Sequence, residues 1–177
     1  MKQIILPVFF LFISFNLQAQ TKTADTTGAA AALTTTAQKM MQLFIDKNYT
    51  AYINFVHPKI ITSLGGKVNM ISIIKKSITD MEQQGYTFKD VTIGAASPII
   101  ISKTELQAVV TQLLELKTAD GKLLSTSYLI ATSNNRGKSW YFSDTSGKNL
   151  KQMKAFFPSL SDKLVIPEKK EPVYYKD

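Results

Sequence analysis

The rhythm of hydrophobic residues changes near Gly85, and this change limits the fold more than any other feature of the sequence. Before Gly85, apolar residues recur at steps of three and four, the spacing that places them on one face of a helix. After it, apolar and polar residues alternate, as expected for strands that bury one face. The sequence therefore predicts a single α+β domain in which helices come first and an antiparallel sheet follows.

Three helices are predicted before Gly85. A long first helix and a short second one cover residues 37–56, with a threonine among residues 34–36 as the cap and a break near Asn48. His57-Pro58 is expected to end the second helix, because proline disfavours helical geometry in the residue before it. The third helix is predicted from Lys67 to Gln84, and Gly85 suits the left-handed conformation that often follows a helix.

The alternating pattern predicts an antiparallel sheet of about four strands that is strongly curved, like a cone. Asp120-Gly121 is a hairpin signal between the two longest strands. A short helix is expected to begin near residues 143–146 and to end at Pro158, and residues 159–177 are predicted to form an extended tail. The expected strands cover residues 86–93, 105–117, 123–133 and 138–143, and residues 99–101 extend or follow the first of them.

The first nineteen residues have the pattern of a secretory signal peptide. Lys2 precedes an apolar run from Ile4 to Phe15, and Ala19 is the small residue before the expected cut. The alternative, a membrane anchor, needs roughly 20 apolar residues, and this run is shorter. We therefore predict a periplasmic or secreted protein, cleaved after Ala19 and without a membrane span, with a flexible leader over residues 20–35 and a folded domain over residues 36–158.

Composition narrows the chemistry further. The chain has no cysteine and a single histidine, which excludes disulfides and zinc–thiolate sites and leaves no metal site or cofactor to expect. The formal net charge is +8, but the lysines are scattered and Arg136 is the sole arginine. Nucleic-acid binding is expected to need a contiguous basic stripe with stacking aromatics, so a solvated basic surface is the better interpretation.

Three features along the chain follow a known order: the helix pair 37–56, His57-Pro58 before Leu64-Gly65-Gly66, and the closing strand 138–142. This order resembles the nuclear transport factor 2-like superfold, which is also called cystatin-like or SnoaL-like. That resemblance implies a pocket inside a cone, and commonly a homodimer through the outer face of the sheet; the superfold hosts enzymes, binding domains and dimerisation modules alike. The segment from Trp140 to the tail also resembles uncharacterised secreted proteins of Bacteroidota.

Three residues are weak candidates for acid/base catalysis, and each has a structural alternative. His57 would need an orienting carboxylate, and otherwise is a polar residue at a helix end. Asp90 points into the cone with a raised pKa, or outward into solvent. Asp144 acts as a base at the open end of the cone, or it caps the helix that starts near Gly147.

Six residues are candidates for lining a pocket. Aromatic walls with a few polar tips suit a small apolar ligand, although core packing explains aromatic residues equally well. Gln112 stands out because it interrupts an apolar strand face, and a buried amide needs partners. Gln112 therefore lines a cavity or belongs to a dimer contact. The candidates are Tyr52, Phe55, Gln112, Tyr128, Trp140 and Phe142.

Three functions agree with these patterns. The first is an exported, non-enzymatic domain that binds a small apolar ligand or a protein partner. The second is a lyase or isomerase that uses acid/base residues in the cone, although the sequence contains no recognisable catalytic constellation. The third is a protein-interaction module that works through the C-terminal tail.

Overall fold

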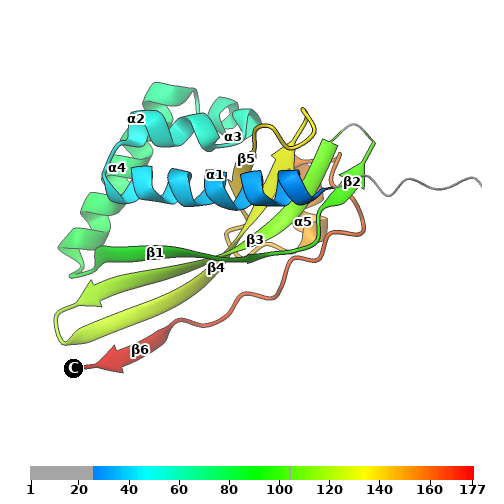
Figure 1. The fold of residues 1–177 in the computed structure, drawn as a ribbon. Helices are drawn as coiled ribbons and strands as arrows, with labels where there is room; N and C mark the ends of the chain where they lie inside the picture. Colours follow the sequence, from blue (N-terminus) through cyan, green and yellow to red (C-terminus); the bar gives the residue numbers. More distant parts are fainter. Residues whose placement is uncertain (1–25, 104) are drawn as a thin grey trace, which may run out of the picture.

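The structure is a computed structural model that describes residues 26–103 and 105–177, and it is an α+β fold in which helices precede an antiparallel sheet (Figure 1). The predicted signal peptide, residues 1–19, and the first six residues of the predicted leader lie outside the described residues. Within the described part of the chain, no helix is long and apolar enough to cross a bilayer.

The first helix, α1, is longer than the sequence pattern predicts. It begins at Thr27, so the predicted flexible leader is wrong over residues 27–35. This stretch is rich in alanine, the best helix former, and Leu33 in its middle is completely buried. The helices and the 3₁₀ turn η1 are α1 (Thr27–Ile45), α2 (Tyr49–Tyr52), η1 (Ile53–Phe55), α3 (Pro58–Ser63) and α4 (Lys67–Gln83).

His57-Pro58 begins a helix where the sequence suggested an end. Pro58 is the first residue of α3, a position whose backbone N–H has no helical partner and which proline therefore suits. The His57 side chain caps this helix, because its Nδ1 atom accepts a hydrogen bond from the Lys59 backbone N–H at 3.1 Å. The dipeptide thus ends one short helical segment and starts the next.

The sheet in the described residues has six strands, two more than predicted, and all its strand pairs are antiparallel. The central order is β1-β3-β4-β5; β2 pairs with the first residues of β3, beyond the end of β1, and β6, from the C-terminal tail, pairs with β4. The sheet is open, and its long strands twist (Figure 1). The strands are β1 (Thr87–Ala96), β2 (Ile100–Ser102), β3 (Glu105–Thr118), β4 (Gly121–Ser133), β5 (Tyr141–Asp144) and β6 (Val173–Lys176).

Helix α5 (Leu150–Phe156) starts later than the sequence suggested. Its cap is Asn149, whose side chain accepts from the Gln152 backbone N–H at 3.0 Å, while Gln152 Oε1 accepts from the Asn149 N–H. This reciprocal pair is a capping box. Asp144 therefore does not cap α5, and the expected start near residues 143–147 is wrong.

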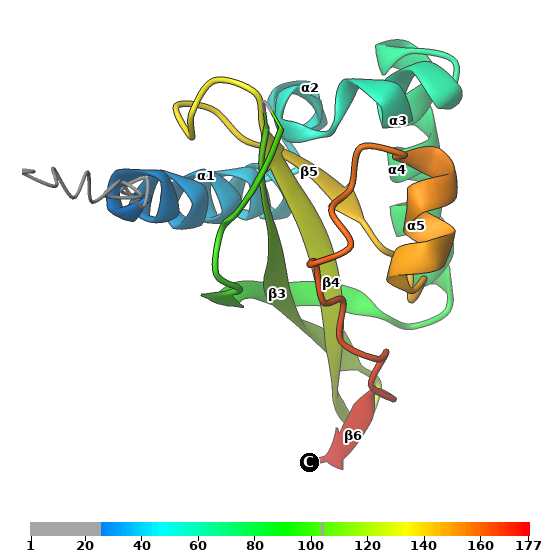
Figure 2. The ribbon, with the colours of Figure 1, turned by 90° about the vertical axis from the view of Figure 1, so that its right-hand side faces the viewer.

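The sheet is covered on both faces. On the inner face, α1 packs on alternate residues of β3 and β4 and on Trp140 and Phe142. On the outer face, α5 and the segment after it cover the other set of alternate residues, among them Val109 and Ile130 (Figure 2). Gln107 anchors that segment, because its Nε2 donates to Ser159 O at 3.0 Å and its Oε1 accepts from Ser161 N–H at 2.8 Å.

The early start of α1 can be tested by mutation. Leu33→Ala is expected to lower the free energy of unfolding by about 2–5 kcal/mol, because it removes a fully buried side chain from the inner core. The matched control is Thr35→Ala on the exposed side of the same helix, with an expected change within about 0.5 kcal/mol. Urea unfolding followed by circular dichroism measures both. Equal, small effects would contradict a docked helix over residues 27–35.

Candidate functional site

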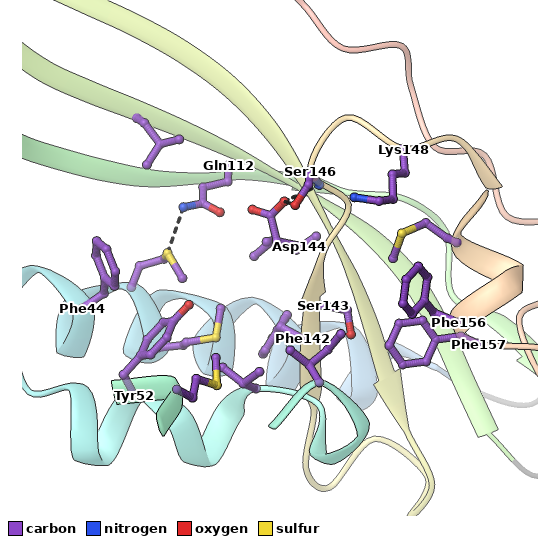
Figure 3. Close-up of a pocket in the computed structure, with 18 of the residues that line it drawn as sticks. Phe44, Tyr52, Gln112, Phe142, Ser143, Asp144, Ser146, Lys148, Phe156 and Phe157 are labelled. Atoms are coloured by element: carbon purple, nitrogen blue, oxygen red, sulfur yellow. Dashed lines mark hydrogen bonds between the residues drawn. The ribbon is translucent and has the colours of Figure 1, made fainter. Parts of the chain in front are cut away.

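A pocket of about 390 Å³ lies between α1, the short helices and the inner face of the sheet. Its volume is in the range of small-molecule sites, roughly 300–1,000 Å³. It extends past the end of β5 toward α5, as Figure 3 shows. The residues that line it are Met40, Met41, Phe44, Tyr52, Val56, Ile60, Met70, Phe88, Gln112, Leu114, Leu129, Phe142, Ser143, Asp144, Ser146, Lys148, Met153, Phe156 and Phe157.

Apolar side chains make most of the pocket wall, and nine of the nineteen lining residues are methionine or phenylalanine. Met40 and Met41 come from the buried side of α1, Met70 from α4 and Met153 from α5. Methionine has a flexible, polarizable side chain that adapts to irregular shapes and makes favourable contacts with aromatic rings. The pocket therefore has a wall that can adjust to an apolar ligand of variable outline.

Gln112 places an amide inside this apolar wall. It lies on the inner face of β3, between Val110 and Leu114 in the alternating pattern, and is 8% exposed. Its Nε2 donates to Met41 Sδ at 3.2 Å, and its Oε1 accepts from Ser127 Oγ at 3.4 Å. Thioether sulfur is a weak acceptor. Gln112 thus lines the cavity, the first of the two alternatives that its sequence position allowed.

Tyr52 offers a neutral hydroxyl donor to the same pocket. Burial, and to a smaller extent the negative charge of Asp144, raise the pKa of Tyr52 to about 12. The phenol therefore stays protonated across the physiological range. Its ring packs on Phe44, with 5.3 Å between the centroids. Among the described residues, no group accepts a hydrogen bond from the Tyr52 hydroxyl.

Asp144 brings a carboxylate to the mouth of the pocket. It lies at the end of β5, opposite Leu129, and its Oδ1 accepts hydrogen bonds from Ser146 N–H and from Ser146 Oγ. No described residue donates to its second oxygen, Oδ2. In Figure 3 the carboxylate lies on the same side of the pocket as the Gln112 amide, with Lys148 beyond Ser146. Asp144 is exposed as a residue, so this end of the site is open to solvent.

The other two catalytic candidates lie outside the pocket lining. The His57 ring packs edge-on against Phe157, with 4.8 Å between the centroids, and burial is the main cause that lowers its pKa. The charge of Glu105 opposes that shift, and the charge of Lys59 adds to it. Asp90 is exposed on β1, and its Oδ2 accepts from Thr92 Oγ1 at 3.2 Å. The pocket therefore brings together only Asp144 of the three.

Three of the six residues that were expected to line the pocket do so, and three lie elsewhere. Tyr52, Gln112 and Phe142 line the pocket. Phe55 packs against the inner core beside it, with Lys39 Nζ 5.9 Å from the centre of its ring. Tyr128 belongs to the outer core beneath α5, and Trp140 is buried deep in the inner core, so neither lines the pocket.

Sequence reasoning missed the methionines and the mouth of the site. Met40 and Met70 lie on helix faces that the periodic pattern marks as apolar, but nothing local distinguishes a cavity wall from a filled core. Ser146 and Lys148 come from the turn before α5, which the sequence placed inside that helix. Within residues 26–103 and 105–177, no cluster of three or more metal-binding side chains is present.

Comparison with known proteins suggests no function for this chain, so its function is inferred from its own geometry. No protein-family model, curated protein or solved structure matches it.

The raised pKa of Tyr52 predicts a pH dependence of stability. The folded-state pKa of about 12 lies above the ordinary 10.0, so the folded state holds this proton more tightly than the unfolded state does. The resulting stabilisation is complete below pH 10 and is lost as the pH rises through 12, by about 3 kcal/mol at most. Urea unfolding of wild type and Tyr52→Phe at pH 9 and pH 11.5 measures the difference, since phenylalanine cannot ionise. Parallel losses in the two proteins would contradict the prediction.

Proposed function

We propose that this chain is an exported, non-enzymatic domain that binds a small apolar ligand in the pocket between α1 and the sheet. The single observation that carries the proposal is a cavity of about 390 Å³ whose wall is mostly apolar, with methionine and phenylalanine at nine of the nineteen lining positions. A cavity in a protein interior forfeits packing contacts, which an apolar ligand restores. Ligand pockets of this kind combine apolar walls with a few polar groups, as Gln112 and Tyr52 provide here.

We also propose that the chain has the nuclear transport factor 2-like fold, in which the sheet curves like a cone. Helices followed by an antiparallel sheet, with a pocket between them, support that assignment. Export to the periplasm or the medium rests on the pattern of residues 1–19, with its apolar run and Ala19. A non-enzymatic role is supported by the placement of the three catalytic candidates, since His57 and Asp90 lie outside the pocket lining and Asp144 alone of the three belongs to it.

Binding can be tested with a pair of variants on neighbouring residues. Leu114 lines the pocket, whereas Leu113 points to the opposite face of β3 and is 45% exposed. We expect the neutral dye N-phenyl-1-naphthylamine to bind wild type with increased fluorescence, Leu114→Trp to weaken binding about tenfold or more by filling the cavity, and Leu113→Trp to leave it unchanged.

Thermal melting of both variants checks that each remains folded. Absence of dye binding to wild type, together with no thermal shift from it, would refute the proposal. Equal binding by the two tryptophan variants would place the dye outside this pocket.

The C-terminal tail supports a second candidate, an interaction module. Among the described residues, β6 pairs only with β4, and Val173, Tyr174 and Tyr175 are each about half exposed. A strand with one free edge is a ready template for pairing with another chain. A second copy is the partner that we propose, because two such edges can pair symmetrically.

We restrict the homodimer contact proposed for the outer face of the sheet to the part of that face that α5 leaves uncovered. Helix α5 and the segment after it cover that face over Val109, Tyr128 and Ile130. The part left open lies toward the β3–β4 hairpin, where Leu113 and the strand β6 are exposed.

Deleting residues 173–177 tests this second candidate. Native mass spectrometry of the full chain at micromolar concentration is expected to show dimers, and the deletion is expected to abolish them. Dye binding in the pocket is expected to stay the same, because β6 contributes no lining residue. Gly121→Val is a second route, since a Cβ at this position would lie 2.0 Å from Tyr175 O and force β6 away. A full chain that is monomeric would remove this candidate.

A further inference from the structure

Two polar groups in the pocket lack a hydrogen-bond partner of the right kind. The Tyr52 hydroxyl is a donor, and none of the residues that the structure describes accepts from it. Asp144 Oδ2 is an acceptor, and none of them donates to it; the hydrogen bonds from Ser146 both go to Oδ1. Both residues line the same pocket (Figure 3).

The two groups are also within electrostatic reach of each other. Both side chains line the same pocket, into which the Tyr52 hydroxyl and the Asp144 carboxylate point in Figure 3, and the Asp144 charge contributes to the raised pKa of Tyr52. They do not bond directly. A ligand group held between them would meet a donor on one side and an acceptor on the other.

The chemistry of that position selects one uncharged group. A hydroxyl oxygen accepts one hydrogen bond and donates another, so it can satisfy both partners. An ether or ketone oxygen only accepts, which leaves Asp144 unmatched. An ammonium group only donates, so the Tyr52 O–H proton finds no acceptor, and the charge of Lys148 at the same mouth opposes it. A carboxylate meets the like charge of Asp144 in a partly apolar site, where such repulsion is costly.

We propose that the ligand of this pocket is an uncharged apolar molecule with one hydroxyl group, which accepts a hydrogen bond from Tyr52 and donates one to Asp144. The apolar body lies against the methionines and phenylalanines of the wall. This inference rests on the proposed binding function and adds the chemical class of the ligand. The hydroxyl sets the orientation, because it is held at the end of the pocket that opens beside Ser146 and Lys148.

A series of ligands on one carbon skeleton tests the assignment. Naphthalene, 2-methoxynaphthalene, 2-naphthol and 2-naphthoate compete with N-phenyl-1-naphthylamine for wild-type protein at pH 7. We expect 2-naphthol to bind about tenfold tighter than 2-methoxynaphthalene, which can accept but not donate. We expect 2-naphthoate to bind most weakly.

Two variants separate the roles of the partners. Tyr52→Phe keeps the ring and is expected to weaken 2-naphthol about three- to tenfold while naphthalene stays the same. Asp144→Asn keeps one acceptor oxygen for Ser146, replaces the second by an NH₂ group that can only donate, and removes the charge. In that variant 2-naphthol is expected to bind about three- to tenfold more weakly while naphthalene stays the same, and 2-naphthoate is expected to bind more tightly than to wild type.

Each outcome bears on a different claim. If naphthalene binds but 2-naphthol gains nothing over 2-methoxynaphthalene, the hydroxyl assignment is overturned and the apolar pocket stands. If none of the four compounds displaces the dye and the dye itself does not bind, both claims are overturned. If Tyr52→Phe weakens all four equally while thermal melting is unchanged, Tyr52 acts by packing alone and the assignment is again overturned.

Discussion

The packing of α1 on the inner face of the sheet is the contact on which the rest of the structure depends. The first half of the helix belongs to the tightest part of the core, since Leu33 and Ala37 share one cluster with Ala108 and Ala131 and all four are fully buried. The backbone of α1 comes closest to β1, whose Val91, Ile93 and Ala96 pack against the same cluster. Since a chain without cysteine has no disulfide to stabilise it, burial of this kind carries the stability of the fold.

The second half of α1 does a different task. Met40 and Met41 are also buried, but they line a cavity together with residues from α4, β3 and β5. One helix thus provides the tightest part of the core and one wall of the site. The outer face has its own covering layer, in which Gln107 joins β3 to the segment after α5. The turn before α5 is held to β4 because Thr145 N–H donates to Tyr128 O at 3.0 Å, and this turn carries Ser146 and Lys148 to the mouth of the pocket.

Local periodicity predicted the elements well, because it reports which side of a strand or helix is buried. The strands after Gly85, the hairpin at Asp120-Gly121 and the helix over residues 67–83 all lie within a few residues of their expected positions. The start of α1 was missed because alanine and threonine carry little hydrophobic signal. Leu33 is recognised as a core residue only when its packing against the sheet is known. The strand β6 was missed for a related reason: its pairing with β4 depends on a tail that returns over a long distance.

The site was less predictable than the fold. Alternation places Gln112 and Tyr128 on definite faces of their strands, but it does not say which face receives α1 and which receives α5. Gln112 lies on the pocket side and Tyr128 on the other. Trp140 and Phe55 fill space that a sequence cannot distinguish from a cavity wall. The relation between Tyr52 and Asp144 joins residues far apart in the chain, and only the folded arrangement makes it visible.

The four methionines in the wall give the site a sensitivity to oxidants. Oxidation of a thioether to a sulfoxide turns an apolar, flexible side chain into a polar one. Met40, Met41, Met70 and Met153 are each less than a tenth exposed, so reagent must enter through the pocket itself. A bound ligand would then shield the sulfur atoms from the reagent. An empty site exposed to peroxide would bind apolar ligands more weakly, although the backbone would remain intact.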